Sequence, residues 1–162
     1  MLASNDNDVK FEDIARLSDV FYIDGTKCGA LFVEAVVISK HGYIPHIFTM
    51  IKQHGALLAK GRITALQFDV LFTDDLYYKN GKIAIDFANL IREALYNKGY
   101  EFAFHTPINK IFIKLNYKQI VKLEDYIRLG FWENLEDGRK NMRIATSWAT
   151  TKENIDKLIS LL

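Results

Sequence analysis

The sharpest chemical feature of the sequence is a lysine flanked by glycines, Lys27 in the segment Asp-Gly-Thr-Lys-Cys-Gly-Ala at residues 24–30. Two apolar runs, both predicted to be buried strands, enclose this segment. Lysine is rare in such a low-dielectric place unless it is paired or hydrogen-bonded. A desolvated lysine loses its proton more readily and becomes a nucleophilic amine, as Schiff-base chemistry requires. Lys27 is therefore either a Schiff-base nucleophile or an ordinary surface lysine at the end of a strand.

Other residues that could do chemistry give weaker patterns. His54 and His105 could carry protons, since imidazole titrates near neutrality, but histidines at helix and strand ends are commonly structural. Cys28 is expected to be a small buried filler, because no base that could activate its thiol is visible. The four histidines include no pair at helical ligand spacing with a matched carboxylate, so no metal site is predicted. The glycine patterns of dinucleotide-binding folds and P-loops are absent from the sequence.

The elements that must position Lys27 are predicted from the spacing of apolar residues. Residues 10–17 have a short helix pattern, residues 19–24 favour a strand, and residues 30–39 favour a second, nearly apolar strand. Continuous apolar strands suit an open α/β sheet that is covered on both faces. A parallel sheet of only these two strands would leave its edges bare. We therefore expect these strands to seek partners and the chain to form oligomers.

Helices dominate the middle of the sequence. Helical patterns begin at Pro45 and again at residue 64, with a bend expected at 56–60. Residues 75–98 give the clearest amphipathic pattern, closed by a C′ glycine at position 99. Its expected apolar face consists of Ile83, Phe87, Leu90, Ile91, Ala94 and Leu95.

The remaining residues predict a small α+β unit with a mostly antiparallel sheet. Residues 101–105 and 110–115 favour strands, and residues 117–127 a helix. Residues 129–135 and 141–146 predict a hairpin around the turn dipeptide Asp137-Gly138. A last helix is expected to begin at a capping box formed by Thr150 and Glu153.

The composition is that of a globular domain. With 162 residues, of which 49% are hydrophobic, the chain can bury a sizeable core. Its 21 basic and 20 acidic residues leave no electrostatic footprint for nucleic acid or an anionic membrane. A single cysteine excludes an intrachain disulfide and fits a reducing compartment. The longest apolar run, residues 28–39, is too short to span a bilayer. These features predict a cytoplasmic protein.

Three collinear segments carry a resemblance to a known family. They are VFYIDGTKCGALF at residues 20–32, IKQHGALLAKGR at residues 51–62, and MRIATSWATT at residues 142–151. The first is similar to the Schiff-base lysine segment of the threonine aldolase and β-eliminating lyase family, which commonly has Gly-Gly-Thr-Lys at this point. The family belongs to the pyridoxal-phosphate-dependent enzymes of fold type I. Because the segments span nearly the whole chain in order, the resemblance is more specific than one motif.

The resemblance implies a fold-type-I architecture and a cofactor, pyridoxal 5′-phosphate. Residues 1–73 would be the C-terminal part of the cofactor-binding large domain, and residues 74–162 a small α+β domain. Lys27 would bind the cofactor as a Schiff base, and Thr26 would touch its phosphate or ring hydroxyl. Arg143 would grip the substrate α-carboxylate through two parallel hydrogen bonds, although an exposed strand arginine is the alternative.

The resemblance also implies a second, weaker pair of cofactor-binding residues. Lys60 and Arg62 would approach the phosphate of a neighbouring subunit in a homo-oligomer. A solvated pair at a helix end is the alternative interpretation.

The expected activity is cleavage of L-threonine or L-allo-threonine to glycine and acetaldehyde. In the family, the aspartate that pairs with the ring nitrogen, the stacking side chain and the phosphate donors come from an N-terminal part, and no residue here matches them. We therefore expect this chain to be a C-terminal half that needs a complementary N-terminal half. The alternative is a catalytically silent remnant that keeps only the fold and an assembly surface.

Two departures from the family pattern lie near Lys27. Asp24 stands where the family usually has glycine, and Val33 replaces another common glycine. A carboxylate at position 24 would place a negative charge close to the lysine amine, which favours the protonated amine.

Overall fold

The computed structural model describes residues 2–162, which divide into two compact units. The N-terminal unit comprises Asp8–Lys79 with Leu2, and the C-terminal unit comprises Asn80–Leu162 with Ala3–Asn7. The division falls inside the long helix α4 (Leu76–Asn97), a few residues after the boundary that the sequence predicts. Each unit has a hydrophobic cluster of its own.

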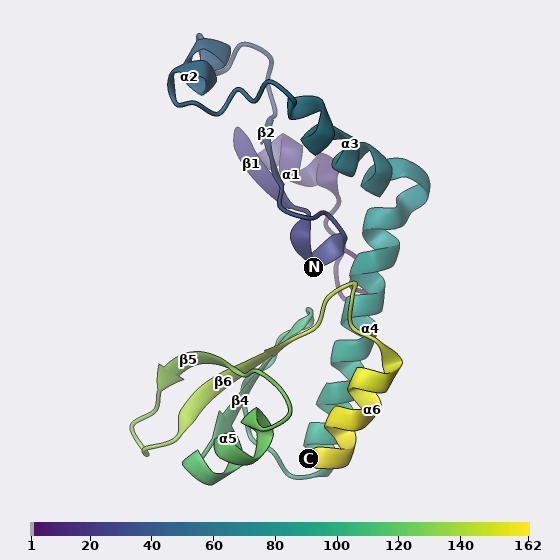
Figure 1. The fold of residues 1–162 in the computed structure, drawn as a ribbon, viewed down its shortest axis with the longest axis vertical. Helices are drawn as coiled ribbons and strands as arrows, with labels where there is room; N and C mark the ends of the chain where they lie inside the picture. Colours follow the sequence, from purple (N-terminus) through teal and green to yellow (C-terminus); the bar gives the residue numbers. More distant parts are fainter. Residues whose placement is uncertain (1) are drawn as a thin grey trace. The chain divides into compact units, whose positions relative to one another are not determined.

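The N-terminal unit is built around a β-hairpin (Figure 1). Strands β1 (Val20–Asp24) and β2 (Glu34–Ile38) pair antiparallel, with Tyr22 opposite Val36. A short 3-10 helix, η1 (Thr26–Cys28), follows β1 directly and carries Lys27. The other elements of the unit are α1 (Phe11–Leu17), α2 (Ile47–Gln53), α3 (Gly61–Phe72), η2 (Thr73–Asp75) and the start of α4.

The expectation of a parallel pair with a second strand from residue 30 is wrong. The connection between the strands is too short for the crossover that parallel strands need, so the chain returns as a hairpin. Strand β2 begins only at Glu34, because the backbone before it forms a tight turn. The amides of Cys28 and Ala30 both donate to the carbonyl of Gly25, at 3.0 and 2.9 Å.

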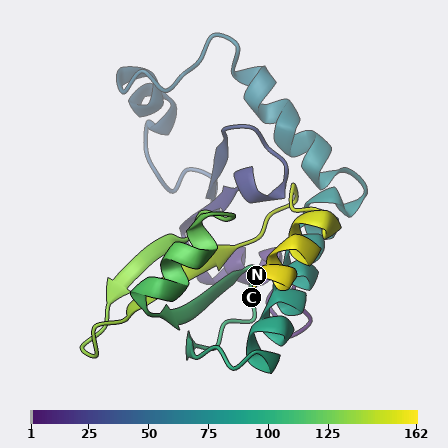
Figure 2. The same cartoon turned by 60° about the horizontal axis from the view of Figure 1, so that its bottom comes forward.

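The C-terminal unit packs helices on one face of a four-stranded antiparallel sheet. The strands β3 (Phe102–Phe104), β4 (Lys110–Leu115), β6 (Lys140–Ala145) and β5 (Gly130–Asn134) lie side by side in that order. Helix α5 (Tyr117–Glu124) connects β4 to β5, and α6 (Lys152–Leu161) ends the chain beside α4 (Figure 2). The expected antiparallel sheet is confirmed, including a left-handed Gly138 in the β5–β6 turn.

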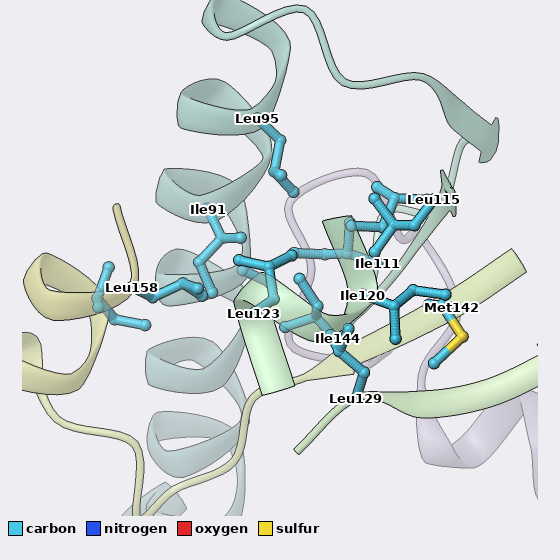
Figure 3. Packing of buried hydrophobic residues seen from close by; sticks show 13 residues of the cluster. Ile91, Leu95, Ile111, Leu115, Ile120, Leu123, Leu129, Met142, Ile144 and Leu158 are labelled. Atoms are coloured by element: carbon cyan, nitrogen blue, oxygen red, sulfur yellow. The ribbon is translucent and has the colours of Figure 1, made fainter. Parts of the chain in front are cut away.

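The core of this unit lies between the sheet and the helices. Ile91 and Leu95 of α4 and Leu158 of α6 point toward Ile111 and Ile144 of the strands (Figure 3). Ile113, Leu115 and Leu123 are fully buried in the same cluster. Burying methylene groups in such a cluster is the main stabilising contribution to the unit.

Two sequence predictions about this unit need correction. The buried face of α4 consists of Ala84, Ile85, Ala88, Ile91 and Leu95, whereas the predicted Ile83 and Leu90 are 43% and 40% exposed. The buried face therefore includes small alanines, which apolar spacing alone does not favour. The capping box of α6 is formed by Thr151 and Asn154 and begins one residue later than predicted.

Candidate active site around Lys27

The turn that carries Lys27 is organised by the carboxylate of Asp24. One carboxylate oxygen, Oδ1, accepts hydrogen bonds from the amide of Thr26 at 2.8 Å and from its hydroxyl at 2.6 Å. The other oxygen, Oδ2, lies 3.3 Å from Nζ of Lys27 and forms an ion pair with it. Asp24, Thr26 and Lys27 therefore form one local network, and the predicted proximity of the Asp24 charge to Lys27 is confirmed.

The two glycines of the turn are required by its shape. A Cβ at Gly25 would lie 2.6 Å from Cβ of Ala30 and 3.3 Å from both Phe68 and the carbonyl of Val33. Gly29 has φ of 118°, in the left-handed region that favours glycine. The turn can therefore be both tight and closely packed only with glycine at these positions.

Lys27 does not lie in a low-dielectric environment within the described residues. Its side chain is 48% exposed, and that of Asp24 is 34% exposed. Of the two settings that the sequence left open, this exposure agrees with a lysine at the end of a strand, because the turn lies at the end of a two-stranded hairpin. The amine is accessible to small molecules from solution, and it forms an ion pair with Asp24.

The ionisation of the neighbouring groups follows from their contacts. Burial raises the pKa of Asp24, but the hydrogen bonds from Thr26 and the positive charge of Lys27 outweigh it and hold that pKa below its ordinary value. Burial raises the pKa of the Cys28 thiol, despite a hydrogen bond with Tyr77. A partly buried thiol with a raised pKa is a poor nucleophile at neutral pH, as expected for a small filler.

Arg143 lies on β6 in the C-terminal unit, between Phe112 of β4 and Gly130 of β5. Its guanidinium lies across Gly130, where a Cβ would be 3.2 Å from Nε and 3.3 Å from an Nη atom. The guanidinium carbon is 6.0 Å from the ring centroid of Trp132, which itself packs edge-on against Phe112. Within residues 2–162, Arg143 forms no ion pair with a carboxylate. Its planar donor face is available to an external anion.

The remaining predicted residues are exposed. Lys60 is the N-cap residue of α3 and Arg62 lies in its first turn. His54 is the C-cap residue of α2. His105 follows β3 and lines a cavity of about 390 Å³ in the C-terminal unit. Among the described residues, no hydrogen bond or ion pair joins any of the four to Asp24, Thr26 or Lys27.

One contact of the Lys27 turn has no counterpart in the sequence pattern. The hydroxyl of Tyr77, in the first turn of α4, donates to the carbonyl oxygen of Asp24 at 3.1 Å. The two residues are separated by 53 positions, and nothing in the local spacing around Tyr77 indicates the contact.

Residues 2–162 contain neither a candidate metal cluster nor a membrane-spanning helix. No group of three or more His, Cys, Asp or Glu side chains in this range could hold a metal ion. No helix in the same range is long and apolar enough to cross a membrane.

Comparison with solved structures identifies the family. The chain matches a threonine aldolase from Leishmania major with 36% sequence identity and a TM-score of 0.93, over 99% of this chain and 47% of that one. The chain belongs to the threonine aldolase family. It spans about half the length of this solved threonine aldolase. The resemblance seen in the three sequence segments is thus confirmed.

Two more distant structures show the same fold in other enzymes. A serine palmitoyltransferase from Sphingomonas wittichii matches with 13% identity and a TM-score of 0.64, over 98% of this chain and 42% of that one. An 8-amino-7-oxononanoate synthase from Francisella tularensis matches with 14% identity and a TM-score of 0.52, over 80% and 40%. The mixed α/β fold of this threonine aldolase family member is therefore that of fold-type-I enzymes. No protein-family model matches the chain, and no curated protein sequence matches it at a significant level.

Proposed function

We propose that this chain contributes the lysine-bearing part of a pyridoxal-phosphate-dependent lyase that cleaves L-threonine or L-allo-threonine into glycine and acetaldehyde. The observation that carries the proposal is Lys27, an accessible primary amine on a rigid turn, in a chain 36% identical to a threonine aldolase. The same turn carries the hydroxyl of Thr26, which contacts the Asp24 carboxylate as the amine does.

The residues of the turn fit covalent attachment of pyridoxal 5′-phosphate. The amine is 48% exposed, and the backbone that carries it is fixed by the Asp24 network and by two amides that donate to the Gly25 carbonyl. When bound, the cofactor withdraws electrons from the amino-acid Cα and so weakens the bonds to that carbon. Lys27 must leave Asp24 and release a proton before its nitrogen can attack an aldehyde carbon.

Arg143 and Thr26 would orient the reactants. Arg143 would hold the α-carboxylate of the amino acid through two parallel hydrogen bonds, which fixes the orientation of Cα and selects the bond that breaks. In the structure, the hydroxyl of Thr26 donates its hydrogen bond to the carboxylate of Asp24. It would become available to the cofactor as the Asp24 network opens. Lys60 and Arg62, both exposed cations, are proposed as weaker contacts to a phosphate.

We propose that a complementary N-terminal half supplies the rest of the site. A cofactor ring needs a carboxylate for its nitrogen, a stacking side chain and phosphate donors. In the Lys27 network the one carboxylate is Asp24, and it is already bonded to Thr26 and Lys27. We therefore propose that the cofactor is held between this chain and that half, in an oligomeric assembly.

A second candidate function is that of a folded assembly domain without catalysis. The observation in its favour is the 3.3 Å ion pair between Lys27 and Asp24, the residue that replaces the usual glycine of the family. An ammonium held by a carboxylate has no lone pair with which to attack an aldehyde.

The test is to mix the chain with pyridoxal phosphate, reduce with borohydride and map the labelled peptides by mass spectrometry. One label per chain on Lys27, with a visible absorption band before reduction, supports the lyase proposal. Lys27→Arg is the matched control, because it keeps a positive charge opposite Asp24 and should lose that label. Labels scattered over many lysines would contradict the lyase proposal and support the assembly domain.

Asp24→Gly restores the residue usual in the family and separates the two candidates further. If the ion pair suppresses attachment, this variant should label Lys27 faster than the wild-type chain does. Arg143→Lys should keep the label on Lys27 but weaken binding of a β-hydroxy amino acid, since an ammonium cannot form the two parallel hydrogen bonds. The shift of the absorption band on titration with the amino acid measures that binding.

A further inference from the structure

Tyr77 contacts both ends of the turn that carries Lys27. Its hydroxyl donates to the carbonyl oxygen of Asp24 at 3.1 Å, and the same hydroxyl hydrogen-bonds with the thiol of Cys28. A phenol has a single proton to donate. That proton points to the carbonyl of Asp24, and the hydroxyl also meets the thiol of Cys28, whose pKa this contact lowers. Tyr77 thus joins residues 24 and 28, and Lys27 lies between them.

The position of this hydroxyl is set by aromatic packing around its ring. The ring of Tyr77 stacks on Phe72 at 5.2 Å between centroids and 24° between planes. Phe11 of α1 lies 5.9 Å away, and Tyr78 meets the ring edge-on at 6.0 Å. Three helices, α1, α3 and α4, therefore hold one phenol against the turn. Such a contact is rigid because the ring cannot turn without disturbing several aromatic neighbours.

The contact is made where the sheet stops holding the backbone. Asp24 is the last residue of β1, and its ladder partner Glu34 is the first of β2. Beyond this point the backbone is held by bonds within the turn, chiefly those accepted by Gly25. These internal bonds fix the curl of the turn but not its tilt relative to α4. The bond from Tyr77 ties the start of the turn to α4, and the bond from the Leu31 amide to Oε1 of Gln67, at 2.8 Å, ties its end to α3.

We infer that Tyr77 is a positioning residue, which holds the Lys27 turn through its hydroxyl so that the amine stays in a defined place. This inference rests on the proposed role of Lys27 in cofactor attachment. Asp24 transmits the effect, since its backbone carbonyl accepts from Tyr77 and its carboxylate contacts Lys27. Without the hydroxyl the carbonyl loses this donor, and the carboxylate and the amine move with the turn.

The hydroxyl keeps its proton over a wide pH range. Burial raises the pKa of Tyr77, and the neighbouring Cys28 and Asp24 raise it further. The phenol therefore remains a donor to Asp24 wherever labelling of Lys27 can be measured.

The test compares Tyr77→Phe with Tyr78→Phe in the full chain. Both substitutions remove one hydroxyl from the same aromatic cluster and keep the ring, but among residues 2–162 no hydrogen bond joins Tyr78 to the turn. The first readout is amide hydrogen exchange at Thr26, Cys28 and Ala30, without cofactor. Tyr77→Phe should speed exchange roughly fivefold, the effect of losing one net hydrogen bond. Tyr78→Phe should stay within about twofold of the wild-type chain.

The second readout is the share of pyridoxal phosphate label found on Lys27, at a temperature where all three proteins are folded. Tyr77→Phe should lower that share, and Tyr78→Phe should not. Unchanged exchange in Tyr77→Phe, or equal changes in both variants, would overturn the inference. So would a lower unfolding midpoint of Tyr77→Phe without a change in the Lys27 share. If the wild-type chain itself labels nonselectively, the proposed function fails, and hydrogen exchange alone decides whether Tyr77 holds the turn.

Discussion

At the scale of residues, Asp24 has opposite effects on the turn and on its lysine. Its carboxylate accepts two hydrogen bonds from Thr26 and contacts the Lys27 amine, so it stabilises the conformation that presents Lys27. The same carboxylate competes with any aldehyde for the amine. A glycine at this position would release the amine but remove the acceptor that organises the turn. Attachment rate and local stability should therefore change in opposite directions when residue 24 is replaced.

The pH dependence of stability should reveal the contribution of Asp24. Its pKa in the folded chain is below the ordinary value of 3.8, so the unfolded chain binds more protons between the two values. The stabilisation is then fully present above pH 3.8 and is lost as pH falls through the folded pKa. Asp24→Asn should destabilise the chain at neutral pH, and the difference from wild type should shrink below about pH 4.

Urea denaturation midpoints measured from pH 7 down to pH 2.5 would check this. Asp8→Asn serves as control, because Asp8 is exposed and its side chain forms no hydrogen bond or ion pair with residues 2–162. A constant difference between Asp24→Asn and the wild-type chain at every pH would contradict the assigned role of the charge.

Sequence patterns found part of this site and missed the rest for identifiable reasons. Lys27 and its neighbour Asp24 were found because the glycine-lysine segment is contiguous and resembles a family motif. The sequence left open whether Lys27 is buried or exposed, because that depends on how many strands surround the turn. Tyr77 was missed because its contact with Asp24 spans 53 residues and depends on where the helices lie.

At the scale of elements, the start of α6 shows how a capping motif can be shifted by one residue. The hydroxyl of Thr151 accepts from the amide of Asn154 at 3.2 Å, and the Asn154 side chain accepts from the amide of Thr151 at 3.3 Å. The hydroxyl of Thr150 instead accepts from the amide of Ser147. Both threonines satisfy the residue preference for a cap, so residue type alone could not choose between the two positions.

Thr151→Ala should therefore cost about 1 kcal/mol of unfolding free energy, because an amide in the first turn of α6 loses its acceptor. Glu153→Gln, at the position that the sequence assigns to the capping box, should change the free energy by less than about 0.5 kcal/mol. Chemical denaturation of the two variants measures the difference. A larger loss in Glu153→Gln than in Thr151→Ala would favour the capping box predicted from sequence.

The buried face of α4 gives a second test at this scale. Leu95 is fully buried in the C-terminal unit, whereas Leu90 is 40% exposed, although both belong to the face predicted from apolar spacing. Leu95→Ala should cost about 2–5 kcal/mol, since it leaves a cavity among Ile91, Leu123 and their neighbours. Leu90→Ala should cost less than about 1 kcal/mol.

Urea denaturation of both α4 variants, side by side, provides the measurement. Similar losses in the two would mean that Leu90 is also covered by apolar contacts in solution. The existence and type of the long helix were predictable from its length and periodicity. Its exact face was not, because that face is set by small side chains.

At the scale of the whole molecule, the two units differ in how completely they bury apolar surface. The C-terminal unit has a continuous core that includes Ile113, Leu115 and Leu123, all fully buried. In the N-terminal unit the buried cluster is only Ala30, Val33 and Leu71, with partly buried aromatics around it. The lysine turn therefore belongs to the unit with the smaller core, and this unit has more to gain from a partner.

The hairpin of the N-terminal unit exposes apolar side chains where a partner could bind. Tyr22 of β1 and Val36 of β2 lie opposite each other on one face and are 68% and 71% exposed. Phe32, in the connection between the strands, is 66% exposed. Exposed apolar side chains that lie opposite each other on paired strands are characteristic of association surfaces. We propose that copies of the chain associate through this face.

Sedimentation velocity over a range of concentrations should then give a mass above the 18.7 kDa of one chain. Tyr22→Glu should shift the distribution toward one chain, because association would bury a charge at the centre of the patch. Tyr117→Glu is the matched control, since Tyr117 is 75% exposed on α5 in the other unit and should leave the mass unchanged. A wild-type chain that sediments as a monomer at every concentration would contradict the proposed association. A complementary half would then be the expected occupant of the patch.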